Sequence, residues 1–405
     1  MKMKKIERVL FDGTFYNGKN PFHGGGEYGK AVLQKALERK GIQECGIFFI
    51  KSQPVQGNIL TMCIEKGIRI HPICDIRNIP NIIKKYHYTT VYSAIPYRNW
   101  ECVKSMEDIR FICSFHGLRT LELADMEASE TGFYNQSEII NRDDFLYGCS
   151  HSENYKMNRE LYKNTLLAFK NSKIITGSQH TKYSIYQHFP ELQSLEIEVL
   201  DDPMKLQEID IDIDEEKKIL DIFKLRETNY GMIISASIWY KNGLRGILAY
   251  DAVFEKNYSF VPDDYKVVVL GVKNVNNFAN RLKHPDRFVF QGYVENTVLE
   301  VLYKYAHLFL FLSLNEGYGY PALEAMKYGT LCACSVNTSI SEVCQDMVLY
   351  FNPLLIDEIE NRILQSFSTE IRSEKEKIIA EKLPTVKKQQ LKALEKIVNI
   401  IFNEA

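Results

Sequence analysis

The chain has 405 residues, of which 45% are hydrophobic and 25% are charged, and its formal net charge is −2. This length exceeds one ordinary hydrophobic core and predicts two domains. The small net charge argues against a general nucleic-acid-binding protein, because such proteins carry many cations to neutralise phosphates. No apolar run reaches the roughly 18 residues of a membrane span. Glu7 and Arg8 interrupt the region where a signal peptide would be apolar.

The nine cysteines show no CxxC spacing, and several of them lie within predicted strands, among them Cys113, Cys332 and Cys334. This usage is typical of buried free thiols, not of a disulfide framework or a zinc site. Because free thiols persist in a reducing compartment, the pattern favours a cytoplasmic protein.

The N-terminal half begins with a predicted strand over residues 6–12. A loop then leads to three glycines, Gly24, Gly25 and Gly26, and a helix with one apolar face is predicted from Glu27 to a stop at Gly41. Strand, glycine-rich turn and helix together indicate a Rossmann-like unit, in which glycines let the backbone approach a diphosphate. A plain hinge is the alternative role for the three glycines.

Alternating strands and helices continue through this half, which predicts an α/β domain. The further strands are expected at residues 45–50, 89–94, 110–116, 173–178 and 197–201, with helices at 155–171 and 182–189. Ser178 is a candidate cap for the second of these helices. The polar and aromatic segment 123–155 is a candidate lid or acceptor contact, since long loops are more often functional than idle.

Asp201, Asp202 and Pro203 interrupt the pattern, and the domain boundary is predicted there. The second half restarts with strands at 232–237, 267–271 and 288–292 and helices at 243–256 and 296–306. Ser339 and Glu342 have the spacing of a capping box for a later helix. A charged helical tail is predicted over residues 371–403. The expected division is 1–203, 204–385 and a C-terminal helix at 386–405.

The most informative stretch is residues 306–335. A continuous apolar strand over 308–312 is followed by Glu316-Gly317-Tyr318-Gly319-Tyr320-Pro321, and Pro321 suits the first turn of a helix. Gly329 is a suitable helix end. Two glycines and a helix start favour an anion, whereas Glu316 and Glu324 suit the hydroxyl groups of a sugar. A sugar carrying phosphate satisfies both features, although a surface helix with two solvated glutamates is the alternative.

Glu316 and Glu324, with seven residues between them, resemble the acidic motif of retaining glycosyltransferases of the two-Rossmann-domain (GT-B) type. The resemblance is to a family 4-like group, glycosyl transferases group 1, which includes bacterial mannosyl-, glucosyl- and rhamnosyltransferases. It implies two Rossmann-like domains facing a cleft, with a C-terminal helix that crosses back to the N-terminal domain. The N-terminal domain would bind the acceptor and the C-terminal domain the nucleotide sugar.

Lys241 follows the first strand of the second half, where a lysine is well placed to neutralise a leaving diphosphate; a solvated helix-start lysine is the alternative. The family usually carries an arginine a few residues earlier, but Ala236 and Ile238 occupy those positions here. Arg245 or another cation would have to compensate. His116 ends a predicted strand, and the resemblance implies that it contacts the donor sugar.

The candidate residues fall into three groups. His116, Lys241 and Glu316 are the expected catalytic residues, and Arg119 and Glu122 are acceptor-side or structural candidates. The expected donor-binding residues are Gly25, Gly26, Tyr293, Val294, Gly317, Tyr318, Gly319, Tyr320 and Glu324. The backbone at Tyr293 and Val294 would contact the nucleotide base.

The expected activity is transfer of a hexosyl group from a nucleotide-diphosphate sugar to a glycan or lipid-linked acceptor, with retention and without metal or cofactor, in polysaccharide synthesis. The alternatives are a degenerate non-catalytic subunit, a sugar-nucleotide epimerase and a phosphorylase. Basic and aromatic residues gather over 84–104. They form either a solvated face or a peripheral contact with the anionic inner face of a membrane.

Overall fold

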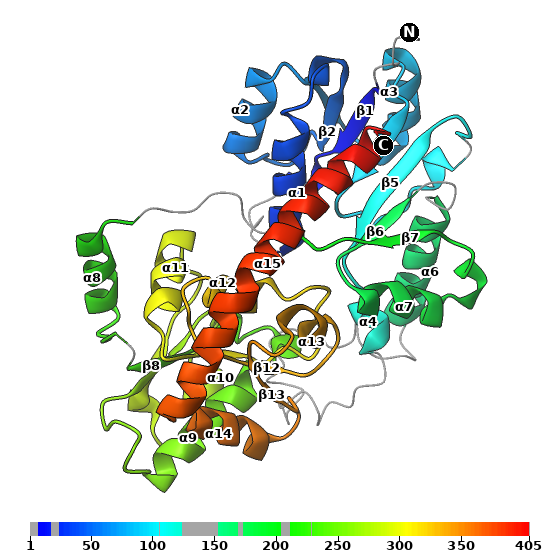
Figure 1. Cartoon of the computed structure of the whole chain (residues 1–405). Coiled ribbons are helices and arrows are strands. Elements are labelled where there is room, and N and C mark those ends of the chain that lie inside the picture. Colours follow the sequence, from blue (N-terminus) through cyan, green and yellow to red (C-terminus); the bar gives the residue numbers. More distant parts are fainter. Residues whose placement is uncertain are drawn as a thin grey trace. The chain divides into compact units, whose positions relative to one another are not determined.

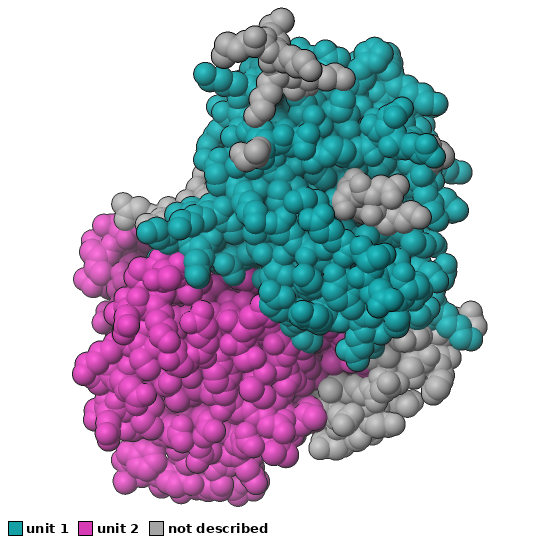
Figure 2. All heavy atoms as spheres, turned by 45° about the vertical axis from the view of Figure 1, so that its right-hand side comes forward, with its two compact units in different colours: residues 1–121, 156–207, 387–405 teal, residues 122–155, 208–386 magenta. Residues whose placement is uncertain are grey.

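The computed structural model describes residues 7–17, 24–104, 106–123, 153–168, 173–203, 211–227 and 229–404 (Figure 1). The chain forms two compact units, coloured separately in Figure 2. Unit 1 comprises residues 1–121, 156–207 and 387–405, and unit 2 comprises residues 122–155 and 208–386. Nearly all of the candidate lid, residues 124–152, lies outside the described residues, and so do the linker residues 204–210.

Unit 1 contains a parallel sheet of seven strands in the order β3-β2-β1-β4-β5-β6-β7. The strands are β1 (Val9–Asp12), β2 (Gly46–Ile50), β3 (Arg69–Ile73), β4 (Thr90–Ser93), β5 (Arg110–Phe115), β6 (Ile174–Thr176) and β7 (Ile197–Val199). The helices in this part of the chain are α1 (Gly24–Ala36), α2 (Gly57–Glu65), α3 (Ile79–Tyr86), α4 (Arg119–Glu122), α6 (Glu153–Ala168) and α7 (Gln179–His188). A parallel order with helical connections brings the carboxyl ends of all strands to one edge, where α/β proteins bind ligands.

Unit 2 contains a parallel sheet of six strands in the order β10-β9-β8-β11-β12-β13. The strands are β8 (Tyr230–Ile233), β9 (Lys266–Val269), β10 (Phe288–Phe290), β11 (Leu308–Phe311), β12 (Cys332–Ser335) and β13 (Leu349–Phe351). The helices are α8 (Ile213–Ile222), α9 (Gly243–Lys256), α10 (Asn276–Ala279), α11 (Asn296–Tyr305), α12 (Tyr320–Met326), α13 (Ser339–Cys344) and α14 (Ile356–Gln365). Strand β11 lies in the middle of the sheet and all four of its residues are buried, as its apolar run predicts.

Helix α15 (Thr369–Ile401) belongs to both units, because its residues from Lys387 onward are part of unit 1. Ile397 and Val398 are fully buried in the same core cluster as Val9 and Val32. Arg39, just after α1, reinforces this packing with a 2.6 Å ion pair to Glu395. The prediction that the C-terminal helix packs on the N-terminal domain is thus confirmed, within a two-domain α/β fold.

Two local expectations were wrong. Helix α1 begins at Gly24 and not at Glu27, so the three glycines form its first turn. The capping box at Ser339 does not form, since the N-cap of α13 is Thr338 and makes no side-chain cap bond. The Ser339 hydroxyl instead donates to the main-chain oxygens of Glu316 and Tyr318, at 2.9 Å and 3.1 Å. The Ser339 hydroxyl therefore binds the loop between β11 and α12 and does not cap α13.

Candidate active site

The loop between β11 and α12 carries the acidic motif at the carboxyl edge of the unit 2 sheet. Gly319 precedes α12 with φ 118° and ψ 36°, a conformation that residues with a side chain rarely adopt. This glycine lets the chain turn directly from the loop into the helix, with Pro321 in the first turn. The Tyr318 side chain points into the protein, since it is only 4% exposed and belongs to the core cluster of unit 2.

Glu316 is held by its side chain and by its main chain. Its carboxylate Oε1 accepts hydrogen bonds from Lys241 Nζ and from Ser313 Oγ. Its main-chain N–H donates to Thr338 Oγ1 at 3.0 Å. With Ser339 on its main-chain oxygen, residues after β12 fix the loop that follows β11. The carboxylate therefore has a defined orientation without any ligand.

Lys241 reaches Glu316 from the neighbouring strand β8. It ends the short 3-10 helix Trp239–Lys241, and its Nζ lies 5.7 Å and 5.9 Å from the ring centres of Tyr240 and Phe311. The Lys241 and Glu316 side chains are only 17% and 11% exposed. Charges that are largely withdrawn from water interact more strongly than surface charges, so this pair provides a polarised site on the sheet edge.

Arg245 lies in the first turn of α9, where its side chain contacts Asn242. It is 6% exposed, and its NH1 donates to Asn242 Oδ1 at 2.8 Å. Asn242 itself has φ 58° and donates through Nδ2 to Pro353 O at 2.7 Å. The guanidinium thus fixes the residue that connects Lys241 to α9.

The predicted donor-binding residues of unit 2 lie on two loops. Gly317, Tyr320 and Glu324 belong to the β11–α12 segment, and the Glu324 side chain is partly exposed one turn into the helix. Tyr293 follows β10 and is 59% exposed. Because β10 and β11 belong to one parallel sheet, both loops lie at its carboxyl edge.

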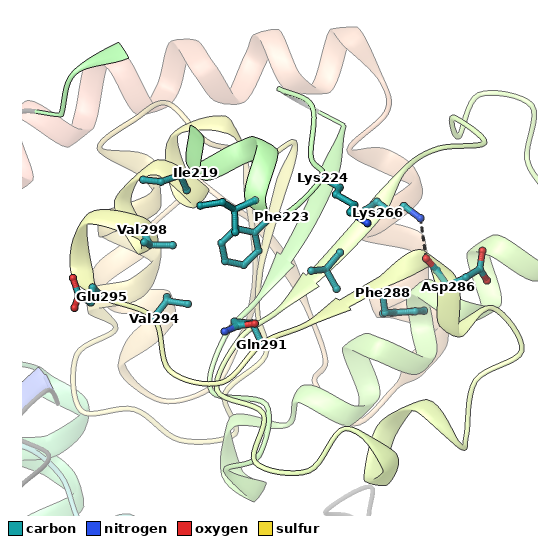
Figure 3. Close-up of a pocket in the computed structure, with 12 residues that line it drawn as sticks. Ile219, Phe223, Lys224, Lys266, Asp286, Phe288, Gln291, Val294, Glu295 and Val298 are labelled. Carbon is teal, nitrogen blue, oxygen red and sulfur yellow. Dashed lines mark hydrogen bonds between the residues drawn. The ribbon is translucent and has the colours of Figure 1, made fainter. Parts of the chain in front are cut away.

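A cavity of about 670 Å³ lies beside the edge strand β10. Figure 3 shows four of its apolar lining residues, Ile219 of α8, Phe223 directly after α8, and Val294 and Val298. Among its lining residues, Val294 is the one that was predicted to bind the donor. Its lining is mainly apolar and does not include Lys241 or Glu316, so this cavity is distinct from the polarised site after β8 and β11.

The remaining predicted residues belong to other segments. Gly25 and Gly26 lie in the first turn of α1, and Arg119 begins α4. Glu122 ends α4, is grouped with unit 2, and accepts a hydrogen bond from Asn315 Nδ2 at 2.6 Å. These candidates therefore lie near the ends of helices and after strands, and they are divided between the two units.

His116 directly follows β5 and has contacts on both ring nitrogens. Its Nε2 lies 2.8 Å from Ala94 O, and its Nδ1 lies 3.6 Å from Asp202 Oδ2. The Tyr28 ring meets the imidazole edge-on at 4.7 Å, and Tyr97 Oη accepts the His116 main-chain N–H at 2.7 Å. Burial alone would lower the pKa of His116, but Asp202 and the Ala94 carbonyl outweigh it and raise the pKa above the ordinary value.

Sequence reasoning missed the residues that support the predicted side chains. Ser313, Thr338 and Ser339 hold Glu316, and Asp202 faces His116. One sequence feature could have found them, because each of these residues lies within four positions after a strand. Such hydroxyl and carboxyl groups meet at the carboxyl edge of a parallel sheet.

Comparison with known proteins gives this arrangement a context. Residues 216–382 match the family model described as glycosyl transferases group 1. O-antigen chain mannosyltransferase B of Escherichia coli is 43% identical over 77 residues, which are 19% of this chain and 20% of that protein. O-antigen chain mannosyltransferase RfbU of Salmonella typhimurium is 27% identical over 137 residues, 33% of this chain and 36% of that protein. The matches thus span about a fifth and about a third of these relatives.

Solved structures match the chain along nearly its whole length. A glycosyltransferase from Rickettsia africae has a TM-score of 0.64 at 14% identity, covering 99% of this chain and 100% of that one. WaaG, a glycosyltransferase involved in lipopolysaccharide biosynthesis, also has a TM-score of 0.64 at 14% identity, covering 97% and 99%. Anabaena HepE in complex with UDP and glucose has a TM-score of 0.62 at 12% identity, covering 96% and 100%.

Two features are absent from the ranges that the structure describes. Within these ranges, no helix is both long enough and apolar enough to cross a bilayer. Among the same residues, no group of three or more His, Cys, Asp or Glu side chains is arranged to hold a metal ion. Residues 216–382 therefore match the glycosyl transferases group 1 family model, and the chain as a whole has the two-Rossmann-domain fold of these solved glycosyltransferases.

Proposed function

We propose that the protein is a retaining, metal-independent hexosyltransferase that moves a sugar from a nucleotide-diphosphate donor to a glycan or lipid-linked acceptor. The observation that carries the proposal is the ion pair between Lys241 and Glu316. It provides, on one sheet edge, a cation for a departing diphosphate and a carboxylate for sugar hydroxyl groups. The family match over residues 216–382 supports the same assignment.

In the proposed reaction, the bond between the anomeric carbon and the donor phosphate breaks while the bond to the acceptor oxygen forms on the same face. Lys241 would exchange Glu316 for the diphosphate and stabilise the charge that develops on it. Glu316 would then accept hydrogen bonds from the sugar, with Ser313 keeping the carboxylate oriented. The acceptor's proton would pass to the departing phosphate oxygen. Fixed charges of this kind are usually the largest contribution to catalysis.

We further propose a mannosyl donor and an acceptor in surface polysaccharide synthesis. The support comes from the relatives of Escherichia coli and Salmonella typhimurium, both of which are named as O-antigen chain mannosyltransferases. Glu324 and the Tyr293–Val294 backbone would contact the ribose and the base. Gly25, Gly26 and His116 are the corresponding proposals within unit 1. These assignments follow the pattern of the family.

A peripheral contact with the inner face of the membrane is part of the proposal. Lys84 and Lys85 lie in the last turn of α3, whose Ile79 and Ile83 are buried. The apolar side of α3 is therefore occupied by the protein core. Contact with an anionic membrane would rest on the lysines, and salt would weaken it.

The test is donor turnover by the purified protein. UDP-, GDP- and dTDP-sugars, with GDP-mannose among them, are incubated with and without a mannose-containing acceptor glycan, and release of nucleoside diphosphate is followed. The proposal predicts release from a single mannosyl donor, acceleration by the acceptor, and an α-linked product from an α-linked donor by NMR. Conversion of the donor to another nucleotide sugar would instead indicate an epimerase. Failure to bind or turn over any donor would contradict the proposal.

A further inference from the structure

Asp202 and His116 approach each other across an intervening strand of the unit 1 sheet. His116 directly follows β5, whereas Asp202 lies three residues beyond β7, and β6 separates the two strands. Their side chains are only 16% and 5% exposed, and Nδ1 and Oδ2 are 3.6 Å apart. At 3.6 Å the two groups are too far apart for a hydrogen bond but close enough for an ion pair once the imidazole is protonated.

Gly177 provides the space for this contact. It directly follows β6, the strand between the other two. A Cβ atom at this position would lie 2.4 Å from Asp202 Oδ1 and 2.8 Å from Asp202 Cγ. The Asp202 carboxylate therefore lies where the side chain of any other residue at position 177 would be.

The main chain of Asp202 is also fixed. Gln390, in the part of α15 that belongs to unit 1, donates from Nε2 to Asp202 O at 2.9 Å. An aspartate has few side-chain rotamers, so a fixed main chain and a confined carboxylate leave Oδ2 little freedom. The Asp202 carboxylate is therefore fixed at the sheet edge and is not a mobile surface group.

The contacts of the imidazole determine its protons. The Ala94 carbonyl can only accept, so the 2.8 Å contact requires a proton on Nε2. If Nδ1 were unprotonated, its lone pair would face the Asp202 carboxylate. Two facing electron-rich atoms repel each other, whereas a protonated Nδ1 turns positive charge toward the carboxylate. The arrangement therefore favours the imidazolium, with both nitrogens protonated.

We propose that Asp202 is a positioning residue which, through the space left by Gly177, holds His116 in one orientation with both ring nitrogens protonated. His116 then acts as a fixed cation at the sheet edge and has no lone pair with which to take a proton from an acceptor. This inference rests on the proposed function for its catalytic meaning. The charge state of His116 itself can be measured without any reaction.

Among the described residues, the titratable groups in contact with His116 are Asp202 from the segment after β7, Tyr28 from α1, and Tyr97 from the segment after β4. Tyr97 accepts the main-chain N–H, and the neutral Ala94 carbonyl contacts the ring. Burial raises the pKa of both tyrosines, so both stay neutral around pH 7. Among these groups, Asp202 is therefore the one whose charge can change the pKa of His116.

NMR titration of the full-length protein with isotope-labelled histidine tests the inference. His116→Gln identifies the His116 signal among the nine histidines. In the wild type, we expect His116 to titrate above the usual histidine value of about 6.5. Asp202→Asn should lower its pKa by about one unit or more, because burial remains while the compensating charge is lost.

Gly177→Ala gives an independent test that keeps every charged group. The added methyl must displace the Asp202 carboxylate, so the His116 pKa should fall in the same direction by a smaller amount. Gly57→Ala is the matched control, because its Cβ would meet nothing within 4 Å, and it should leave the His116 pKa unchanged. A wild-type pKa below about 6.5 would overturn the inference. So would an unchanged pKa in both Asp202→Asn and Gly177→Ala.

The pH dependence of turnover then shows whether His116 acts as a cation or as a base. A required imidazolium predicts that kcat/KM falls as the pH rises through the His116 pKa, and that Gly177→Ala moves this fall to lower pH. A rate that falls as the pH decreases through that pKa would mean that His116 works as a base and would overturn the inference. Absence of any turnover would count against the proposed function, while the titration would still decide the pairing of His116 with Asp202.

Discussion

Lys241 and Glu316, which follow the neighbouring strands β8 and β11, form an ion pair at the carboxyl edge of the unit 2 sheet. Ser313 donates to the same carboxylate oxygen as the lysine. The two loops are therefore joined by charge and not only by packing. In the proposed reaction, each group would exchange its partner for a phosphate or for sugar hydroxyl groups.

The pair should be strongly coupled in the absence of a ligand. In a double-mutant cycle of Lys241→Met and Glu316→Gln, we expect a coupling of about 1–3 kcal/mol in the free energy of unfolding, since both side chains are largely buried. The exposed pair Lys283–Glu255, at 63% and 51% exposure, is the matched control and should give less than about 1 kcal/mol. Urea unfolding measures both. Equal couplings would mean that burial does not strengthen the Lys241–Glu316 pair.

Gly319 should be needed for the shape of the loop, and Gly329 only for stability. Both have positive φ, 118° and 77°, and in both the added Cβ would meet no atom within 3.4 Å. Gly319→Ala and Gly329→Ala should each cost about 1–3 kcal/mol of unfolding free energy through backbone strain. Only Gly319→Ala should also reduce donor turnover, because it alters the chain between Glu316 and α12. Equal turnover in the two variants would contradict this role.

His307 should make unit 2 sensitive to acid. Burial, with a smaller contribution from Arg372, lowers its pKa to about 3. The folded state therefore stays neutral below pH 6.5, where the unfolded histidine takes up a proton, so the unfolding free energy falls as the pH decreases. The loss should reach about 1.4 kcal/mol per pH unit.

The matched measurement compares the wild type with His307→Gln by urea unfolding at pH 7.5, 6 and 5. The stability advantage of the wild type should shrink by up to about 2 kcal/mol across this range. The exposed His87, with φ 56°, can be replaced by Asn as a control that should show no such trend. A constant difference between the wild type and His307→Gln would exclude the proposed cause.

The end of α15 should contribute to the stability of unit 1. Ile397 is fully buried, so Ile397→Ala should cost about 2–5 kcal/mol. Leu391, in the same helix, is 60% exposed, and Leu391→Ala should change the unfolding free energy by less than about 0.5 kcal/mol. Both are measured by chemical denaturation. A small loss for Ile397→Ala would mean that the helix end does not belong to the core of unit 1.

The sequence predicted the strands whose composition matches their burial. Strand β11 was clear because an apolar run is what a strand covered on both faces requires. Strand β3 (Arg69–Ile73) was missed, because it is an edge strand that contains Arg69, His71 and Pro72. Strand β13 (Leu349–Phe351), a three-residue strand at the other sheet's edge, was also missed.

For the candidate site, sequence reasoning named Glu316, Lys241 and His116 but not the residues that hold them. Glu316 and Lys241 were identifiable because each follows a predicted strand and matches a known motif. Their partners Ser313 and Thr338, and the pairing of Asp202 with His116, depend on which strands lie side by side. Strand order arises from long-range packing, and a single sequence does not contain it as a local pattern.

The most direct test of the account is donor turnover by Glu316→Gln and Lys241→Met, beside Glu255→Gln and Lys283→Met as exposed controls. The account predicts that each site variant loses about 100-fold or more in kcat, because a fixed charge that acts in the transition state is removed. The control variants should keep the wild-type rate. If both site variants turned over the donor as fast as the wild type, the Lys241–Glu316 pair would be a structural ion pair and not the centre of catalysis.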